Sequence, residues 1–155
     1  MEVDLRRRAG VVRPGRPPIG QAVPVPPPYD ARNFMELLGI DVPMPDEDRD
    51  QVARLTVTHP LIAGTGYLWA PVVMAMADAL CAFGVSHHWP EGARSFTTVD
   101  CSTNFISSAR EGEQVAATAS PLHLGRTTQV WDATVTNETT ERLMASYRCT
   151  QLILY

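Results

Sequence analysis

Hydrophobic and polar positions alternate over several long stretches in the second half of the chain. Short turns at Glu111-Gly112, at Gly125 and at residues 137–139 separate these stretches. Alternation with a period of two, broken by short turns, predicts long antiparallel strands arranged as a meander. The four predicted strands cover residues 94–106, 113–124, 126–136 and 142–154. A shorter strand is predicted before them, over residues 51–58.

Residues 71–83 have a different pattern, which is typical of a buried helix. Almost every side chain in this segment is hydrophobic, and Asp78 is the exception. Pro71 suits the first helical position, where its missing N–H costs nothing, and Gly84 is expected to end the helix. A helix that is apolar all round must be covered on most sides.

A second, short helix is expected over residues 34–38, with Asn33 as its cap and Gly39 as its end. In the rest of the chain the order is a strand, a buried helix and four strands. One sheet that curls round one helix is the economical way to bury such a helix. The pattern therefore predicts an α+β fold.

The prolines indicate where the folded domain begins. Nine of the thirteen prolines in this chain of 155 residues lie at or before Pro45. Residues 1–30, rich in proline and arginine, are expected to form a flexible arm. Residues 31–50 are expected to hold the short helix and an acidic connector, and residues 51–155 the domain itself.

The charged residues exclude several classes of function. The formal net charge is -4 at pH 7, which gives no general attraction to nucleic acid or to an anionic membrane. All thirteen basic residues are arginine. Because the chain has no lysine, mechanisms that need a Schiff-base or phosphate-loop lysine are excluded.

The sequence indicates neither export, nor membrane insertion, nor a metal site. Four prolines and two arginines interrupt residues 9–25, so a signal-peptide core is absent there. The longest apolar stretch, residues 68–85, contains a charge and is expected to be too short and too polar to span a bilayer. Cys81, Cys101 and Cys149 lack metal-like spacing and are expected to be buried thiols. We therefore expect a soluble, cytoplasmic protein.

Asp78 is the residue that most needs an explanation. A carboxylate in an apolar helix is costly unless it is paired or has a function. From the residues alone two interpretations stay open: a functional acid, or a carboxylate bonded to a hydroxyl or to an arginine at a subunit boundary. Trp69, before the helix, is either the wall of a pocket or part of the core. Thr98, taken alone, is an ordinary strand threonine.

Residues 66–78 read GYLWAPVVMAMAD and resemble the helix-entry motif of the PaaI-type, or 4-hydroxybenzoyl-CoA thioesterase-like, family. That motif is N-x-x-G-x-x-H-G-G, followed by six residues and then D or E. Gly66 matches its glycine and Asp78 its catalytic carboxylate. Residues 98–109 and 124–126 are similar to the two strand segments that follow in the family. The resemblance covers residues 50–155 and implies a hotdog fold, in which a five- to six-stranded antiparallel sheet wraps round one central helix.

The resemblance also implies a function. Members of the family hydrolyse thioesters of CoA or of an acyl carrier protein, with Asp78 here as nucleophile or base. The Ala70 N–H would stabilise the oxyanion, and Thr98 would help to orient the attacking group. Arg126 would bind CoA phosphates. CoA or phosphopantetheine would enter only as part of the substrate, with no further cofactor. The site would lie between two subunits of a homodimer or a dimer of dimers.

Two residues depart from the family motif. Trp69 stands where the family has histidine, and Ala63 where it has asparagine. Tryptophan cannot shuttle protons at pH 7, so hydrolysis should be slower or use other groups. Besides Gly66, Trp69 and Arg126, we therefore include His59 among the expected substrate-binding residues. Two alternatives stay open: a non-hydrolytic tailoring enzyme or dehydratase, and a catalytically silent acyl-CoA-binding protein.

Overall fold

The computed structural model describes residues 32–42 and 52–155. The predicted arm over residues 1–30 and most of the predicted acidic connector lie outside the described residues. Two helices and a short 3-10 turn are present in the described ranges: α1 (Arg32–Leu38), α2 (Ala70–His87) and η1 (His59–Leu61). The strands are β1 (Ile40–Asp41), β2 (Val52–Thr56), β3 (Ser95–Phe105), β4 (Gln114–Leu124), β5 (Thr128–Asn137) and β6 (Arg142–Leu154).

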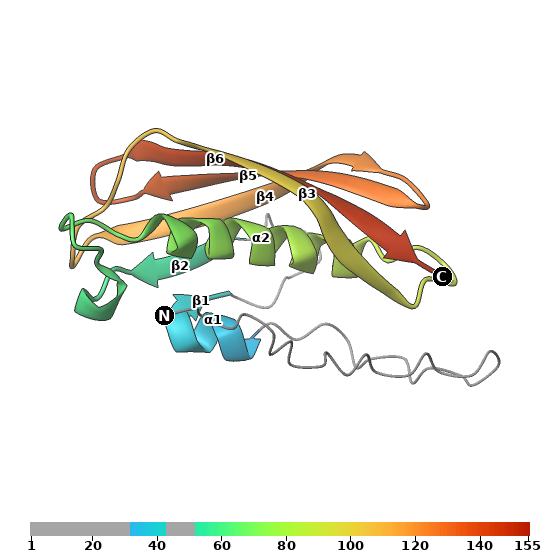
Figure 1. Cartoon of the computed structure of the whole chain (residues 1–155), viewed down its shortest axis with the longest axis horizontal. Coiled ribbons are helices and arrows are strands. Elements are labelled where there is room, and N and C mark those ends of the chain that lie inside the picture. The colour runs from blue at the N-terminus through green and yellow to red at the C-terminus, as the bar shows by residue number, and fades with distance from the viewer. Residues whose placement is uncertain (1–31, 43–51) are drawn as a thin grey trace, which may run out of the picture.

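The six strands form one antiparallel sheet, in the order β1-β2-β4-β5-β6-β3. The sheet curves over α2, and α1 lies on the far side of α2 from the long strands (Figure 1). The predicted α+β architecture, with one helix inside a curved antiparallel sheet, is therefore confirmed.

The predicted meander of four strands was wrong for β3. Only β4, β5 and β6 follow one another in the sheet, while β3 pairs with β6 at the edge. After β3 the Ile106 N–H still donates to the carbonyl oxygen of Met144 in β6. The chain then crosses the molecule, and the Gly112 N–H reaches the carbonyl oxygen of Val57, beside β2, at 2.8 Å. The connection after β3 is therefore a crossover rather than a hairpin.

The core lies between α2 and the concave face of the sheet. The largest fully buried hydrophobic side chains come from both, and they include Leu55, Met76, Leu80, Val115, Val135 and Met144. A narrower stripe of α2 is only half-buried, and Met74, Ala75 and Asp78 lie on it. The single charge of the helix is thus on the side that the sheet covers least.

By length and composition α2 would be able to cross a membrane, which corrects the expectation from its sequence. However, 56% of its apolar window is buried inside the protein. This burial is typical of the core helix of a soluble domain, because an apolar helix must be covered by other parts of the fold.

Three helix boundaries were predicted at an asparagine or a glycine, and the structure confirms one of them. α1 begins at Arg32, so Asn33 lies inside it rather than at its cap, while Gly39 ends it with a φ of +71° as expected. Gly84 does not end α2, which continues to His87. A Cβ atom on Gly84 would lie 2.4 Å from the indole ring of Trp131. Gly84 is therefore a contact point between helix and sheet.

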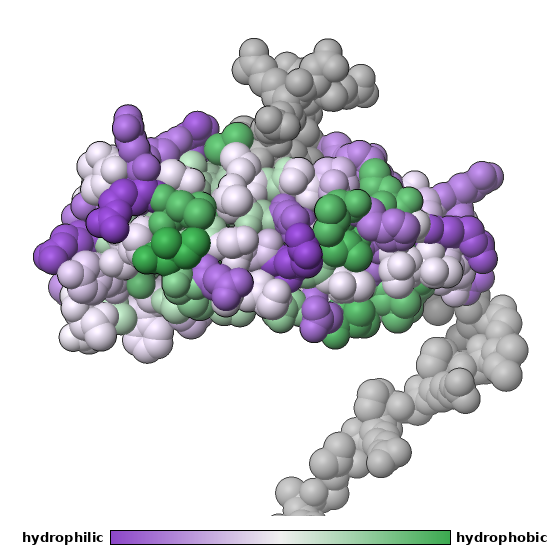
Figure 2. All heavy atoms as spheres, turned by 90° about the horizontal axis from the view of Figure 1, so that it is seen from above, coloured by the Kyte–Doolittle hydropathy of each residue, from purple (hydrophilic) through white to green (hydrophobic). Residues whose placement is uncertain are grey.

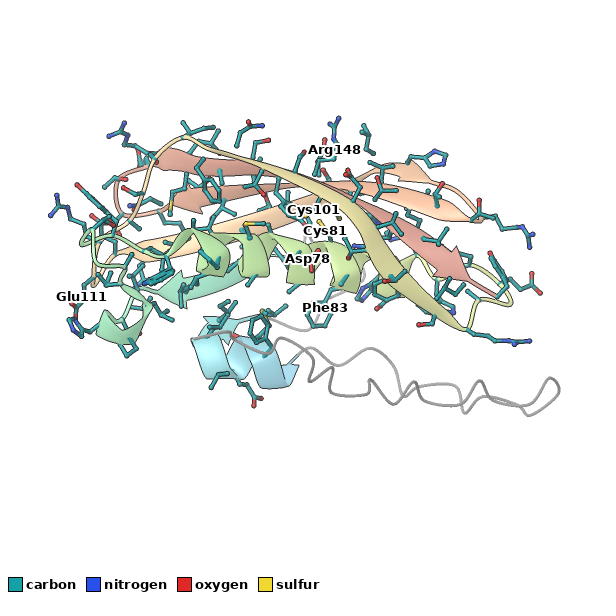
Figure 3. The ribbon with its side chains drawn as sticks, in the orientation of Figure 1. Asp78, Cys81, Phe83, Cys101, Glu111 and Arg148 are labelled. Carbon is teal, nitrogen blue, oxygen red and sulfur yellow. The ribbon has the colours of Figure 1, made fainter. Side chains whose placement is uncertain are left out.

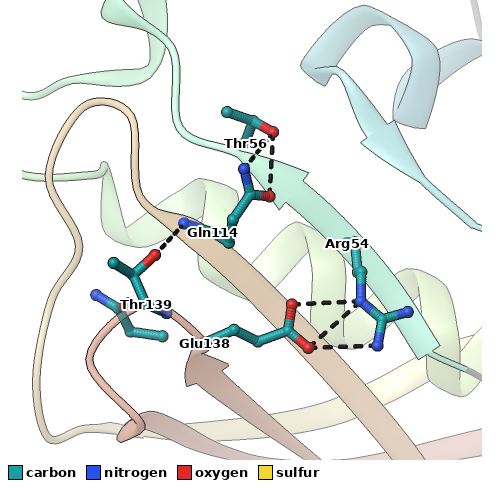
Figure 4. A network of polar contacts seen from close by, with 6 residues as sticks. Arg54, Thr56, Gln114, Glu138 and Thr139 are labelled. Atoms are coloured by element: carbon teal, nitrogen blue, oxygen red, sulfur yellow. Dashed lines mark hydrogen bonds and ion pairs between the residues drawn. The ribbon is translucent and has the colours of Figure 1, made fainter.

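A polar network ties β2 to β4 and to the β5–β6 turn (Figure 4). Arg54 on β2 forms an ion pair with Glu138 in that turn at 3.3 Å. The Gln114 N–H donates to Thr139 Oγ1 at 2.9 Å, and the Gln114 side chain bonds with Thr56. These exposed contacts add little stability individually, but they join three segments at one end of the sheet.

The convex face of the sheet is predominantly polar. Figure 2 looks onto this side and shows hydrophilic residues between separate hydrophobic groups. Arg148 donates two hydrogen bonds to Asp132 across β5 and β6, at 2.6 and 2.8 Å. Thr118 and Thr134 are bonded at 2.9 Å on the same face. Buried polar side chains that could act on a substrate are therefore expected on the concave side of the sheet.

We predict that Gly84→Ala destabilises the fold by about 1–3 kcal/mol, because a methyl group would overlap the Trp131 ring. In an ordinary helix the same change stabilises by about 1 kcal/mol. Trp131 cannot easily move, because its indole N–H donates to Gln129 and Gln129 donates to the carbonyl oxygen of His88. Thermal unfolding measures the effect.

Gly64→Ala is the matched control, since a Cβ there would meet nothing within 4 Å. Equal melting temperatures for the two variants would contradict the assigned contact.

Candidate functional site

The chain enters α2 through a tight loop. The Ala63 N–H donates to the carbonyl oxygen of Tyr67 at 2.8 Å, and the Gly66 N–H donates to that of Ala63 at 2.9 Å. Gly66 has a φ of +82°, a conformation that residues with a Cβ rarely adopt. The glycine of the motif therefore has a structural role in closing this loop, and the N–H of Ala63 is used within it.

Backbone contacts hold the start of α2 on two sides. The Trp69 N–H donates to the carbonyl oxygen of Leu61 in η1 at 3.0 Å. The Leu68 N–H donates to the carbonyl oxygen of Ala109 at 2.9 Å. Ala109 is fully buried and lies in the β3–β4 connection. The position of the helix N-terminus is thus tied to the segment that crosses the molecule after β3.

The first turn of α2 presents a usable backbone donor at Ala70. The Val72 N–H donates to the carbonyl oxygen of Trp69, and Pro71 has no N–H. The Ala70 N–H has no backbone acceptor among the described residues. It therefore points out of the positive end of the helix dipole, where it can stabilise a negatively charged oxygen. The Trp69 side chain beside it is 50% exposed.

Asp78 lies two helical turns further along α2 and contacts β6. The Tyr147 hydroxyl donates to Asp78 Oδ1 at 2.7 Å. Tyr147 is itself only 2% exposed, so this bond forms inside the protein. The sequence interpretation of a carboxylate bonded to a hydroxyl describes part of this arrangement, but Tyr147 was not among the predicted site residues. The sequence pattern did place Tyr147 on the inward face of its strand, which was the one indication that it could reach the helix.

Tyr147 is a permanent donor in this pair. Burial and the hydrogen bond to Asp78 hold the pKa of the Tyr147 phenol far above its usual range. The phenol is therefore protonated at neutral pH, and its O–H is directed at the carboxylate.

All three cysteines surround this pair. The Cys81 thiol, one turn after Asp78, has a raised pKa because it is hydrogen-bonded to Cys149 and buried, so it stays protonated. Cys101 lies opposite Cys149 in the β3–β6 register. Cys101 is exposed, because β3 is an edge strand with no further strand beside it among the described residues. The expectation of three buried thiols was therefore wrong for Cys101.

Thr98 also lies on the edge strand β3. Its Oγ1 donates to Gln151 Oε1 at 3.0 Å, and Gln151 is fully buried on β6. The register shifts between Thr98 and Asp100, so Val99 bulges out and is 55% exposed. The Thr98 hydroxyl thus donates to Gln151, and the hydrogen bond to the Asp78 carboxylate comes from Tyr147.

His59 is not brought to Asp78. Its side chain is 84% exposed on η1, and its Nδ1 lies 3.1 Å from Glu111 Oε2. Figure 3 shows Glu111 at one end of the molecule and Asp78 near the middle. A hotdog dehydratase needs a histidine paired with an acid. Within one protomer, His59 and Asp78 do not form such a pair.

Arg126 lies in the β4–β5 turn, beside an open cavity of about 620 Å³. Its guanidinium stacks on the Tyr155 ring at 4.7 Å, and the Tyr155 hydroxyl donates to the Arg126 carbonyl oxygen at 2.6 Å. His88, Gly125 and Gln129 also line this cavity. The site residues thus form three groups: the α2 N-terminus, Asp78 with Tyr147, and Arg126.

The described part of the chain contains no cluster of three metal-ligating side chains. The candidate site offers a half-buried carboxylate, a phenol and a free helix N–H. Such a set can activate water and stabilise an oxyanion.

The sequence model of the thioesterase superfamily matches residues 65–144, from the loop before α2 to the start of β6. This protein belongs to the thioesterase superfamily. Its relative in Listeria monocytogenes, 1,4-dihydroxy-2-naphthoyl-CoA hydrolase, is 30% identical over 117 residues, which cover 76% of this chain and 92% of the relative. The predicted family is therefore confirmed.

Solved structures agree with this assignment. A mutant of the thioesterase SAV0944 from Staphylococcus aureus has a TM-score of 0.71 and 28% identity, covering 79% of this chain and 99% of that one. The PaaI protein of E. coli has a TM-score of 0.67 at 23% identity, covering 81% and 86%. This chain thus has the hotdog fold, and it belongs to a family of thioester hydrolases.

Tyr147 is predicted not to ionise in the folded enzyme, because burial and Asp78 hold its pKa high. Spectrophotometric titration of the phenols should give the same amplitude for the folded wild type and for Tyr147→Phe. In denaturant the variant should lose the signal of one of the four tyrosines. A smaller amplitude for the folded variant would show that Tyr147 is accessible to hydroxide.

Proposed function

We propose that this enzyme hydrolyses an acyl-CoA or acyl-carrier-protein thioester, with Asp78 as the base for the attacking water. The observation that carries the proposal is the half-buried Asp78 carboxylate on the central helix of a thioesterase fold. Asp78 takes a proton from water, and the water oxygen bonds to the thioester carbon. The resulting oxyanion accepts from the Ala70 N–H, and the C–S bond breaks as the thiolate takes up the proton.

The helix geometry supports a site that two subunits share. Asp78 follows Ala70 by eight residues, which is about 12 Å along a rigid helix. One thioester carbonyl cannot contact both groups of the same chain. In the part of the chain that the structure describes, no strand pairs with the outer edge of β3, and Phe105 on this strand is exposed. We therefore propose a homodimer, or a dimer of dimers, in which Ala70 of one subunit works with Asp78 of the other.

Trp69 shapes the pocket in this proposal and does not take part in proton transfer. Its half-exposed indole lies next to the Ala70 N–H, where the thioester carbonyl would bind. A flat indole face suits a planar, aromatic acyl group through stacking. The Listeria relative is named for a naphthoyl-CoA substrate, which is of this kind. We propose an aromatic acyl-CoA as the substrate class, and a cytoplasmic location where CoA thioesters are made.

A catalytically silent acyl-CoA-binding protein is the second candidate. Trp69 in place of the family histidine, and Ala63 with its N–H engaged in the loop, favour it. Thiol release across a panel of acyl-CoA and carrier-protein thioesters, with binding measured in parallel, separates the two candidates. Binding of a thioester without thiol release would support the silent protein.

Asp78→Asn is predicted to abolish thioester hydrolysis, a loss of at least about 100-fold in kcat, because an amide cannot accept the proton from water. Folding and dimerisation should be retained, since the amide oxygen can still accept from Tyr147. Thiol release, melting temperature and size-exclusion chromatography measure these properties. Unchanged hydrolysis by the variant would reject Asp78 as the base.

Arg126→Ala is predicted to raise KM for a CoA thioester about 10-fold, because a charge-assisted contact to phosphate is lost. KM for a truncated thioester without the nucleotide should stay the same. Arg142→Ala is the matched control, since Arg142 is an exposed arginine at the start of β6, opposite the end of β5 that lies far from Arg126. Equal changes for both thioesters would place Arg126 outside the CoA site.

A further inference from the structure

Asp78 needs a partner because of where it lies. On the helix, Met74, Ala75 and Ala82 lie one turn away and are apolar, and the thiol of Cys81 is hydrogen-bonded to Cys149. A half-buried carboxylate without a donor would be free to rotate, and its charge would be poorly solvated. Among the described residues the hydrogen bond that the Asp78 side chain receives comes from Tyr147.

The bond from Tyr147 has the geometry of a strong, fixed contact. Its length of 2.7 Å is that of a well-formed O–H···O bond and lies at the upper end of the range of charge-assisted bonds. Tyr147 lies in the middle of β6, which is paired on both sides by β5 and β3. A phenol ring on such a strand has few accessible rotamers. The donor is therefore held rigidly, and so is the oxygen that accepts from it.

We propose that Tyr147 is a positioning residue for the reaction: it holds Oδ1 of Asp78 so that Oδ2 faces the substrate water. This inference rests on the proposed function, in which Asp78 is the base. The described residues offer no donor to Oδ2, so this oxygen remains available to accept a proton. Because its phenol stays protonated, Tyr147 does not itself move protons, and it acts only through the carboxylate.

The orientation of Asp78 does not depend on the residue at the histidine position of the motif. In this chain that residue is Trp69, which lies two helical turns from Asp78 of the same chain. The orienting group comes instead from the sheet that covers the helix. It belongs to the same chain as Asp78, so the acid is preorganised before any partner subunit or substrate binds.

Tyr147→Phe tests this role, with Asp78→Asn measured in parallel on the full chain. Loss of one charge-assisted hydrogen bond should lower kcat about 10- to 100-fold. KM should change less than about twofold, since Tyr147 does not touch the substrate. The rates are expressed per folded protein, from circular dichroism at the assay temperature, so that lower stability does not count as lower kcat.

Ser146→Ala is the matched control, because Ser146 also carries a hydroxyl on β6 but lies exposed on the opposite face. It should keep the wild-type kcat. If Asp78→Asn is inactive while Tyr147→Phe keeps the wild-type kcat, or if Tyr147→Phe changes only KM, the positioning role is rejected and the proposed function stands. If Asp78→Asn still hydrolyses the thioester, both proposals are rejected.

Discussion

The burial of one apolar helix is the constraint on which the rest of this structure depends. α2 carries a single charge, and a sheet of six strands must curve to cover it. The cover is incomplete along the stripe that holds Asp78, where the helix is only half-buried among the described residues. The half-buried carboxylate meets the sheet at Tyr147 on β6, next to the edge strand β3. Fold and site are consequences of the same packing.

Local sequence patterns predicted the elements well but not their neighbours. Alternation placed β3, β4, β5 and β6 within two residues of their observed ends, since the period of two reflects which side chains face the core. It could not place β3 next to β6, because strand order depends on contacts between distant segments. The prediction that Gly84 ends α2 was wrong for a similar reason. The small size of Gly84 makes room for Trp131, which is far away in sequence.

The same division holds for the candidate site. The motif located Gly66, Ala70 and Asp78, since spacing along one loop and one helix is a local property. Tyr147 is 69 residues from Asp78, and only the folding of β6 over α2 brings its hydroxyl to the carboxylate. Alternation placed Tyr147 on the inward face of its strand, but it does not say which helical residue a strand residue meets. Long-range polar pairs of this kind need the tertiary structure.

The residues of the candidate site differ in how freely they can be substituted. The acid and its phenol partner belong to one protomer, and both are held by the strands around α2. The Ala70 N–H depends only on the backbone at the start of the helix, so any residue except proline can supply it. In the proposed dimer the side chain at position 69 is then the part that is free to vary. Replacing histidine by tryptophan there changes the shape of the pocket while the carboxylate, its orientation and the oxyanion donor are retained.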